Sequence, residues 1–432
     1  MFKLAKTLGT SCLIILSAAS AVAQKEKLAK VVAGHPVNYS EDSVGSYTLP
    51  DVLRLQNGRL VKDSKTWQEK RRPELLKLFE QHQFGVVPGK PKAMSVQTLE
   101  DHGRALNGIA VRKQTRIYFS NDTSKNKMDL LIYLPEKASQ PSPLLLLINF
   151  QPNSMVVDDP AVRRGYYWTK EGKRLLAPEE RVPSKINIAS FISQGIGVAM
   201  VYYGDIEPDF KGGLKYGVRS LYLKPGQTTV KDSEWGTISA WSWGLSRAMD
   251  YFETDKDIDA KRVALQGTSR LGKTVLWTGA RDERFKLVIA SCSGEGGAAL
   301  SRRNYGEGVE HMTDTSRYYY QFAPKRHSYT GRINESPVDA HMLVALMAPR
   351  PLLLQTGDTD YWSDPKGEFL AAKAAQPVYQ LFGKKGPAGE EFPAASDTSL
   401  MFNPLGYYMH AGGHGPIPAD WPLYLQYLKK FL

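Results

Sequence analysis

The sequence is short of cysteine and of long apolar segments. Its 432 residues include two cysteines, Cys12 and Cys292, and no apolar stretch long enough to cross a bilayer. No Ser- or Gly-rich linker, internal repeat or low-complexity segment divides the chain. The histidine, cysteine and carboxylate residues match no metal-binding spacing, and no glycine-rich phosphate loop is present. We therefore expect no membrane span, no metal and no cofactor.

The first 23 residues have the features of a secretory signal peptide. Lys3 and Lys6 form a charged start, an apolar centre follows, and a small-residue Ala-Val-Ala cleavage site ends at Ala23. We predict a signal peptide over residues 1–23 and a mature protein that is secreted, either periplasmic or extracellular. Cleavage leaves Cys292 as the one cysteine, so an intramolecular disulfide is excluded.

The mature chain keeps a moderate positive charge. The formal net charge is +12, and loss of the two signal lysines lowers it to +10. An excess of this size is typical of a solvated basic surface, and it would also attract acidic polymers such as uronic-acid polysaccharides. No nucleic-acid-binding motif accompanies the charge, so we do not expect nucleic acid as a partner.

The mature chain, residues 24–432, is predicted to form a single α/β domain with large loops. Continuous apolar runs at Leu144–Ile148 and Gly197–Val201 are typical of parallel strands covered on both faces. Three alternating segments before them predict an antiparallel edge: Met94–Leu99, Ala110–Phe119 and Met128–Leu134. Helices are predicted over Ser64–Phe84 (with Pro73 as an alternative start), Ser233–Thr254, Pro337–Ala348, Pro365–Leu381 and Asp420–Leu432.

The most informative stretch runs from Val263 to Gly297. An apolar strand-like run stops at Gly267-Thr268-Ser269-Arg270-Leu271-Gly272, and an amphipathic helix and a second apolar run follow. A strand, a sharp turn with a serine at its tip, a helix and a strand predict the nucleophile of an α/β-hydrolase. The second glycine comes one position later than in the usual G-x-S-x-G. A serine that merely caps a helix is therefore the alternative interpretation.

A serine nucleophile needs a base, and the base needs an acid to fix its tautomer. In α/β-hydrolases the three follow the chain order Ser, Asp or Glu, His. Ser269, Asp360 and His414 satisfy this order, and each follows an apolar strand or lies in a glycine-rich loop. His410 is the alternative base among the eight histidines.

Several long segments carry a family resemblance. They are YGDIEPDF (203–210), GTSRLGK (267–273), SGEGGAALSRR (293–303), DAHMLVALMAPRPLLL (339–354), DYWSDPKGEF (360–369) and GGHG (412–415). In these segments the chain resembles the glucuronoyl esterases, carbohydrate esterase family fifteen, from about residue 60 to its end. The resemblance implies an α/β-hydrolase fold, no cofactor, and cleavage of esters between 4-O-methyl-glucuronate on xylan and alcohols of lignin.

The resemblance also implies roles for individual residues. Ser269 matches the nucleophile, His414 the base, and Arg270 an oxyanion contributor through its backbone N–H and its guanidinium. The residues that match sugar contacts are Lys273, Glu307 and Trp362. Ser269 and Lys273 are four residues apart, so on a helix they share a face. For the charged sugar contacts, ordinary surface charge is the alternative interpretation.

The triad acid is where this chain departs from the commoner family pattern. In many members a glutamate stands just before the Ser-Gly of an SGxGG motif, and here that position is Cys292. A neutral thiol cannot orient an imidazole as a carboxylate does. Other bacterial members carry the acid after the next strand, where Asp360 lies, and we predict this residue over Glu295.

Together these features predict a secreted serine esterase that acts as a monomer on glucuronoxylan or lignin-carbohydrate esters. A general carboxylesterase or acetyl xylan esterase on the same fold is the alternative enzyme. A carbohydrate-binding pseudo-enzyme that has lost its acid at Cys292 is the alternative from another class.

Overall fold

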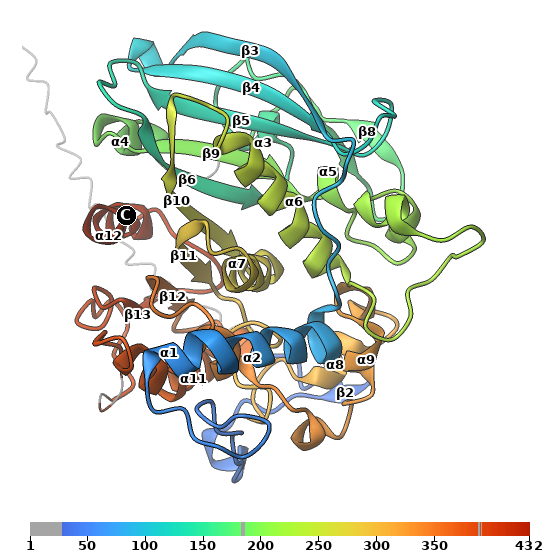
Figure 1. Cartoon of the computed structure of the whole chain (residues 1–432), viewed down its shortest axis with the longest axis vertical. Coiled ribbons are helices and arrows are strands. Elements are labelled where there is room, and N and C mark those ends of the chain that lie inside the picture. Colours follow the sequence, from blue (N-terminus) through green and yellow to red (C-terminus); the bar gives the residue numbers. More distant parts are fainter. Residues whose placement is uncertain (1–27, 183–185, 388, 390) are drawn as a thin grey trace, which may run out of the picture.

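The described part of the chain is built on a nine-stranded sheet (Figure 1). The computed structural model describes residues 28–182, 186–387, 389 and 391–432, so the predicted signal peptide lies outside the described residues. The strands, in order across the sheet, are β13 (Leu405–His410), β12 (Leu352–Gly357), β11 (Phe285–Ser291), β10 (Ile258–Thr268), β6 (Ser142–Asn149), β9 (Gly197–Tyr202), β5 (Lys127–Pro135), β4 (Ala110–Tyr118) and β3 (Ser95–Ala105).

The sheet has a parallel part and an antiparallel edge, as predicted. The six strands from β13 to β9 run parallel, whereas β5, β4 and β3 pair antiparallel to their neighbours. The apolar run Leu144–Ile148 lies in β6, between β10 and β9, and is buried throughout. Helices on both faces exclude water from these strands, which explains their continuous rather than alternating apolar pattern.

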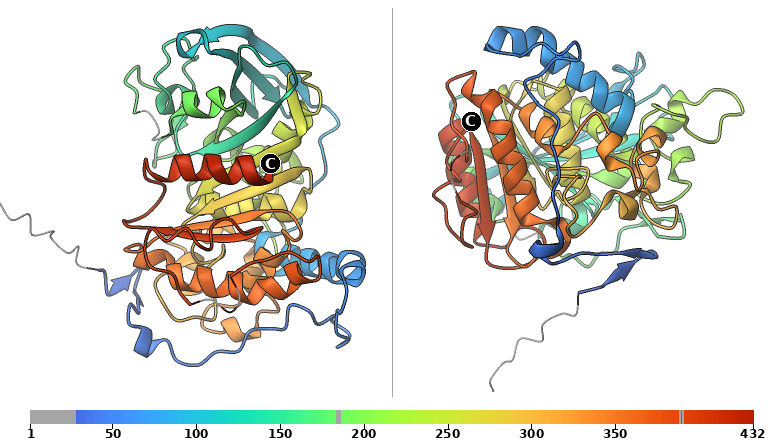
Figure 2. Two further views of the ribbon diagram at one scale, coloured as in Figure 1. Left: turned by 90° about the vertical axis from the view of Figure 1, so that its left-hand side faces the viewer. Right: turned by 90° about the horizontal axis from the view of Figure 1, so that it is seen from below.

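Helices cover both faces of the sheet (Figures 1 and 2). On one face a core forms under α2 (Arg72–Phe79), α6 (Thr237–Phe252), α7 (Arg270–Arg281), α10 (Ala340–Ala345) and α11 (Pro365–Gln380). On the other face, α4 (Ile188–Ser193) and α12 (Asp420–Phe431) cover a smaller core. This is the arrangement predicted for the α/β-hydrolase fold. No helix within the described ranges combines the length and the apolarity needed to span a bilayer.

The first long helical segment continues through its proline. Asp63 caps its start by accepting a hydrogen bond from the Thr66 N–H at 2.7 Å. A π-helical stretch, Trp67–Arg71, then leads into α2, where Pro73 occupies the first turn. The missing N–H of Pro73 falls at this change of hydrogen-bond register, so the helical course is not broken. The helix predicted over 337–348 is shorter in the structure, because α10 ends at Ala345.

The remaining elements are short, and all of them except α1, which opens the helical segment just described, belong to the loops. They are β1 (Val31–Val32), β2 (His35–Pro36), α1 (Ser64–Thr66), α3 (Asn153–Val156), β7 (Tyr166–Trp168), β8 (Arg174–Leu176), α5 (Tyr203–Ile206), α8 (Val309–Thr313) and α9 (Pro324–His327). Since the parallel strands all end at the same edge of the sheet, the residues that follow β10, β11, β12 and β13 are gathered there.

Candidate active site

Ser269 sits on a strained turn between β10 and α7. Its backbone has φ 59° and ψ −128°, a conformation that is costly for any residue other than glycine. Both flanking glycines are required by close packing. A Cβ on Gly267 would lie 2.4 Å from the Leu271 oxygen, and a Cβ on Gly272 would lie 2.9 Å from the Ser291 oxygen. The later position of the second glycine therefore reflects packing of α7 against the end of β11.

The serine does not act as a helix cap. Ser269 immediately precedes α7, yet its side chain makes no capping hydrogen bond, so the helix-cap interpretation is wrong. Ser269 and His414 both line a cavity of about 330 Å³. The local fold thus places the serine at this cavity without using its side chain as a helix cap.

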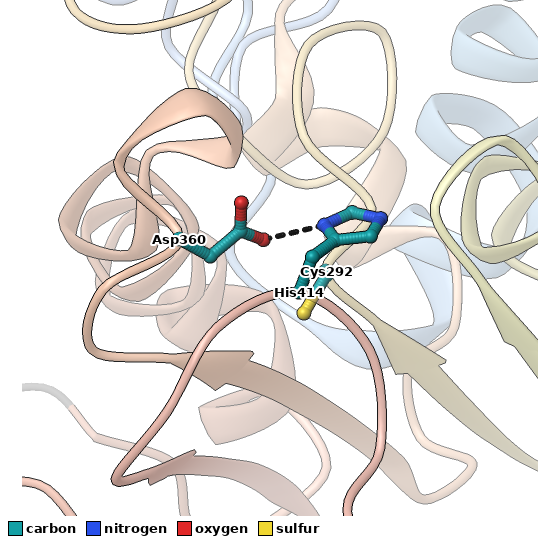
Figure 3. A group of neighbouring side chains, drawn as sticks. All are labelled: Cys292, Asp360 and His414. Carbon is teal, nitrogen blue, oxygen red and sulfur yellow. Dashed lines mark hydrogen bonds and ion pairs between the residues drawn. The ribbon is translucent and has the colours of Figure 1, made fainter. Parts of the chain in front are cut away.

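Asp360 and His414, which both line this cavity, form a hydrogen-bonded pair (Figure 3). The Asp360 Oδ2 lies 2.7 Å from His414 Nδ1. Asp360 is almost fully buried, whereas the His414 side chain is 44% exposed. Figure 3 shows the second ring nitrogen of His414 pointing away from Asp360. The Ser363 hydroxyl lies 3.3 Å from the same Nδ1, so this nitrogen has a second polar neighbour.

The alternative acid and the alternative base are engaged elsewhere. The buried carboxylate of Glu295 pairs with Arg326. His410 is also buried, and its two nitrogens contact Asp420 Oδ2 at 2.8 Å and the Gly413 carbonyl oxygen at 3.0 Å. The structure therefore brings Asp360, and not Glu295, to His414.

Cys292 lies directly beside the Asp360–His414 pair. It follows β11 with φ 45°, and its N–H donates to the Gln355 carbonyl at 2.7 Å. Its buried Sγ accepts a hydrogen bond from the Gly415 N–H at 3.3 Å. Burial, and then the charge of Asp360, raise the pKa of the thiol well above its ordinary value. The group is therefore a neutral thiol, which cannot replace the family glutamate as an acid that orients histidine.

A polar wall of Lys273, Glu307 and Trp362 lines the same cavity. The Lys273 Nζ lies 3.5 Å from Glu307 Oε2, and the Trp362 indole N–H donates to Glu307 Oε1 at 3.1 Å. Arg317 approaches Glu307 Oε1 at 3.8 Å. Lys273 and Glu307 are both nearly buried, so they are not the ordinary surface charges of the alternative interpretation.

Arg270 follows Ser269 in the chain, and neighbouring side chains fix the position of its guanidinium. Its guanidinium pairs with the buried carboxylate of Asp209 and lies 4.4 Å from the ring centre of Tyr318. Asp209 also accepts hydrogen bonds from Tyr320 at 3.0 Å and from Gln321 at 2.8 Å. Burial alone would lower the pKa of Arg270, but the Asp209 charge outweighs it and raises the pKa above its ordinary value. Arg270 therefore stays cationic.

Several cavity residues were missed by sequence reasoning. Asp209 lies in one of the family-like segments, but its charge alone gave no reason to connect it with Arg270. The residues that line the cavity without having been predicted are Cys292, Met312, Arg317, Tyr318, Gln321 and Ser363. Five of them lie in or next to irregular loops between 309 and 363, where periodicity carries no signal.

Known proteins share both the sequence and the fold of this chain. A family model described as "Glucuronyl esterase, fungi" matches residues 228–383. The solved structure of a glucuronoyl esterase from Solibacter usitatus is 44% identical, covers 90% of this chain and 99% of its own, and superposes with a TM-score of 0.86. The chain belongs to the glucuronoyl esterase family.

Two further known proteins are similar to this chain. A structure described as a promiscuous CE15 esterase from a marine bacterial metagenome is 40% identical, covers 92% of this chain and all of its own, and has a TM-score of 0.84. A 4-O-methyl-glucuronoyl methylesterase from Neurospora crassa is 29% identical over 198 residues, 42% of this chain and 50% of its own. Family and fold are thus confirmed as predicted, and the chain is a carboxylic ester hydrolase.

Proposed function

We propose that this enzyme hydrolyses the ester that joins 4-O-methyl-glucuronate on xylan to an alcohol, including alcohols of lignin. One observation carries the proposal. A single cavity of about 330 Å³ is lined by Ser269, by the Asp360–His414 pair and by a polar wall suited to sugar hydroxyls. The first two elements supply ester chemistry, and the third supplies selection for a sugar.

In the acylation step, Ser269 Oγ attacks the ester carbonyl of the uronate. His414 Nε2 takes the hydroxyl proton and then gives it to the departing alcohol. Asp360, 2.7 Å from Nδ1, keeps the ring proton on that nitrogen and stabilises the imidazolium that forms. Water then attacks the acyl-enzyme with His414 again as base, which releases the uronic acid and restores Ser269.

Arg270 supports the negative charge that develops on the carbonyl oxygen. Its backbone N–H lies at the start of α7, where a helix N-terminus favours negative charge. Its guanidinium remains charged because of Asp209, so a full positive charge is available next to the serine. The proposal gives Arg270 the role of an oxyanion stabiliser with a fixed geometry.

The wall of Lys273, Glu307 and Trp362 fits a neutral sugar ester. The Lys273 and Glu307 charges lie 3.5 Å apart and compensate one another, and Arg317, 3.8 Å from Glu307, adds one positive charge beside them. A uronate ester carries no carboxylate charge and presents only hydroxyl and ether oxygens. Lys273 can donate to these hydroxyls and Glu307 can accept from them, while Trp362 offers an apolar ring edge.

We also propose that the enzyme is secreted after cleavage near Ala23, and that it acts as a monomer. Residues 1–23 carry the charge, apolar centre and cleavage pattern of a signal peptide. N-terminal sequencing of the exported protein and light scattering in solution test these two statements.

The experiment that tests the function compares kcat/KM for benzyl glucuronate with that for a simple acetyl ester. We expect the glucuronate ester to be preferred by a factor of more than about 100, since two charged hydrogen-bonding groups contribute about 1.5–3 kcal/mol each. Equal rates would favour a general carboxylesterase, the second candidate, which the relative described as promiscuous supports. Binding to glucuronoxylan without hydrolysis would contradict both.

A further inference from the structure

The side chains of Cys292, Asp360 and His414 bring three chemically distinct metal-ligand groups close together. The Cys292 Sγ, one Asp360 carboxylate oxygen and one His414 ring nitrogen all lie within 4.8 Å of one another (Figure 3). The three residues are separated by 68 and 54 positions in the chain, so no spacing motif in the sequence could reveal them. Thiolate, imidazole and carboxylate together are a donor set typical of zinc and its heavier analogues.

We propose that Cys292, Asp360 and His414 form a binding site for a soft divalent metal ion such as Zn²⁺ or Cd²⁺. We further propose that occupation of this site reversibly blocks the esterase. The block rests on the proposed roles of His414 and Asp360, whereas binding of the ion does not.

The geometry requires only small movements. Tetrahedral zinc, with sulfur at about 2.3 Å and nitrogen or oxygen at about 2.0–2.2 Å, holds neighbouring ligand atoms about 3.4–3.6 Å apart. The Asp360–His414 contact of 2.7 Å must therefore open by about 0.7 Å. Sγ must close on the ring nitrogen by at most about 1.2 Å, because the present separation is within 4.8 Å.

The surroundings allow these movements and give the ion a route. His414 is 44% exposed and stands in a loop with glycines at 412, 413 and 415, so its ring can shift. Cys292 and His414 both line the 330 Å³ cavity, through which an ion can enter. Sγ already accepts a hydrogen bond from the Gly415 N–H at 3.3 Å, and this contact is compatible with a thiolate acceptor.

Binding would remove the base that Ser269 needs. The ion displaces the thiol proton, which passes to water, and it takes the place of the proton on His414 Nδ1. The ring proton then resides on Nε2, so this nitrogen can no longer accept the Ser269 proton. Asp360 is held by the ion at the same time, and the serine is left without activation.

The direct test uses Cd²⁺, because a cadmium–thiolate bond absorbs in the ultraviolet and the exported chain has a single thiol. We expect a titration of the exported enzyme to produce this absorption in parallel with loss of activity on benzyl glucuronate. Cys292→Ser replaces the thiol by a hydroxyl. Measured against its own metal-free rate, this variant should show no absorption and need at least tenfold more Zn²⁺ or Cd²⁺ for the same fractional inhibition. A chelator should restore activity, and Mg²⁺, which prefers oxygen ligands, should have no effect.

Equal inhibition of the wild type and Cys292→Ser would overturn the proposal, since the ion would then be held without the thiol. Absorption without inhibition would also overturn it, because the ion would then be bound without His414. If neither the absorption nor the inhibition appeared at metal concentrations up to about millimolar, the proposal would also be overturned. The absorption does not depend on turnover, so failure of the proposed esterase function would leave the test of metal binding intact.

Discussion

The Asp360–His414 contact leads to the sharpest prediction on a single residue. In Asp360→Asn the amide N–H₂ faces His414 Nδ1, so the ring proton moves to Nε2, where it blocks acceptance of the Ser269 proton. An equivalent change in a triad lowers kcat by about 10⁴. The Ser363 hydroxyl, 3.3 Å from Nδ1, can still accept from the correct tautomer. We therefore expect a loss of about 10³ in kcat, or about 4 kcal/mol in activation free energy.

Glu295→Gln is the matched control, because Glu295 is the other carboxylate considered for the acid. Its carboxylate pairs with Arg326, and both side chains are at most 2% exposed. Loss of one partner of a buried ion pair costs about 3–5 kcal/mol of folding stability, and the amide oxygen of glutamine keeps part of the hydrogen bonding. We expect a lower Tm by several degrees and a kcat within about threefold of the wild type below the transition.

The assay is benzyl glucuronate hydrolysis at saturating substrate, at a temperature where circular dichroism shows both variants folded. Asp360→Asn should lose turnover at nearly unchanged stability, whereas Glu295→Gln should lose stability at nearly unchanged turnover. A greater loss of kcat in Glu295→Gln than in Asp360→Asn would refute the reasoning and would give the acid role to the loop after β11.

Three further predictions follow from other contacts. Lys273→Ala and Glu307→Ala should each lower kcat/KM for benzyl glucuronate by about 10- to 100-fold and leave kcat/KM for phenyl acetate within about twofold of the wild type. Equal losses on both substrates would mean that Lys273 and Glu307 support the fold instead. Burial first, with Asp360 adding to it, raises the pKa of Glu368 to about 8, so the folded state holds this proton while the unfolded state loses it near pH 4.5. The free energy of unfolding should thus fall between about pH 5 and 8, and thermal unfolding of Glu368→Gln should lack this part of the pH dependence. Parallel profiles of Tm against pH for the wild type and the variant would contradict this prediction. Asp209→Asn should lower kcat about 10- to 100-fold by releasing Arg270, less than loss of a whole oxyanion donor, and an unchanged kcat would exclude this positioning role.

Local patterns predicted the parts of the site that depend on neighbouring residues in the chain. The turn at Ser269 follows from a buried strand, two glycines and an amphipathic helix, all within twenty residues. Asp360 and His414 follow β12 and β13, which are adjacent and parallel, so chain order and strand ends together placed them at one edge. These are properties that the sequence periodicity and the sheet rules determine.

Contacts between distant segments escaped prediction because no local pattern encodes them. Asp209 reaches Arg270 across 61 positions, from a loop without periodicity. Glu368 looks like an ordinary charge in the first turn of a helix, yet it is fully buried and accepts hydrogen bonds from Ser293 and from the Gly294 N–H. The position of Cys292 beside His414 also depends on how the loops after two strands pack, which composition does not reveal.

The measurement that tests the central claim most directly is the hydrolysis of benzyl glucuronate by Ser269→Ala. Removal of a triad serine costs about 10⁶ in kcat elsewhere. The substitution deletes a half-buried hydroxyl that makes no capping hydrogen bond to α7. We predict a loss of at least about 10⁴ in kcat/KM, with an unchanged circular dichroism spectrum and Tm within about 2 °C of the wild type. Hydrolysis at a near-normal rate by this folded variant would contradict the account of a serine esterase centred on Ser269.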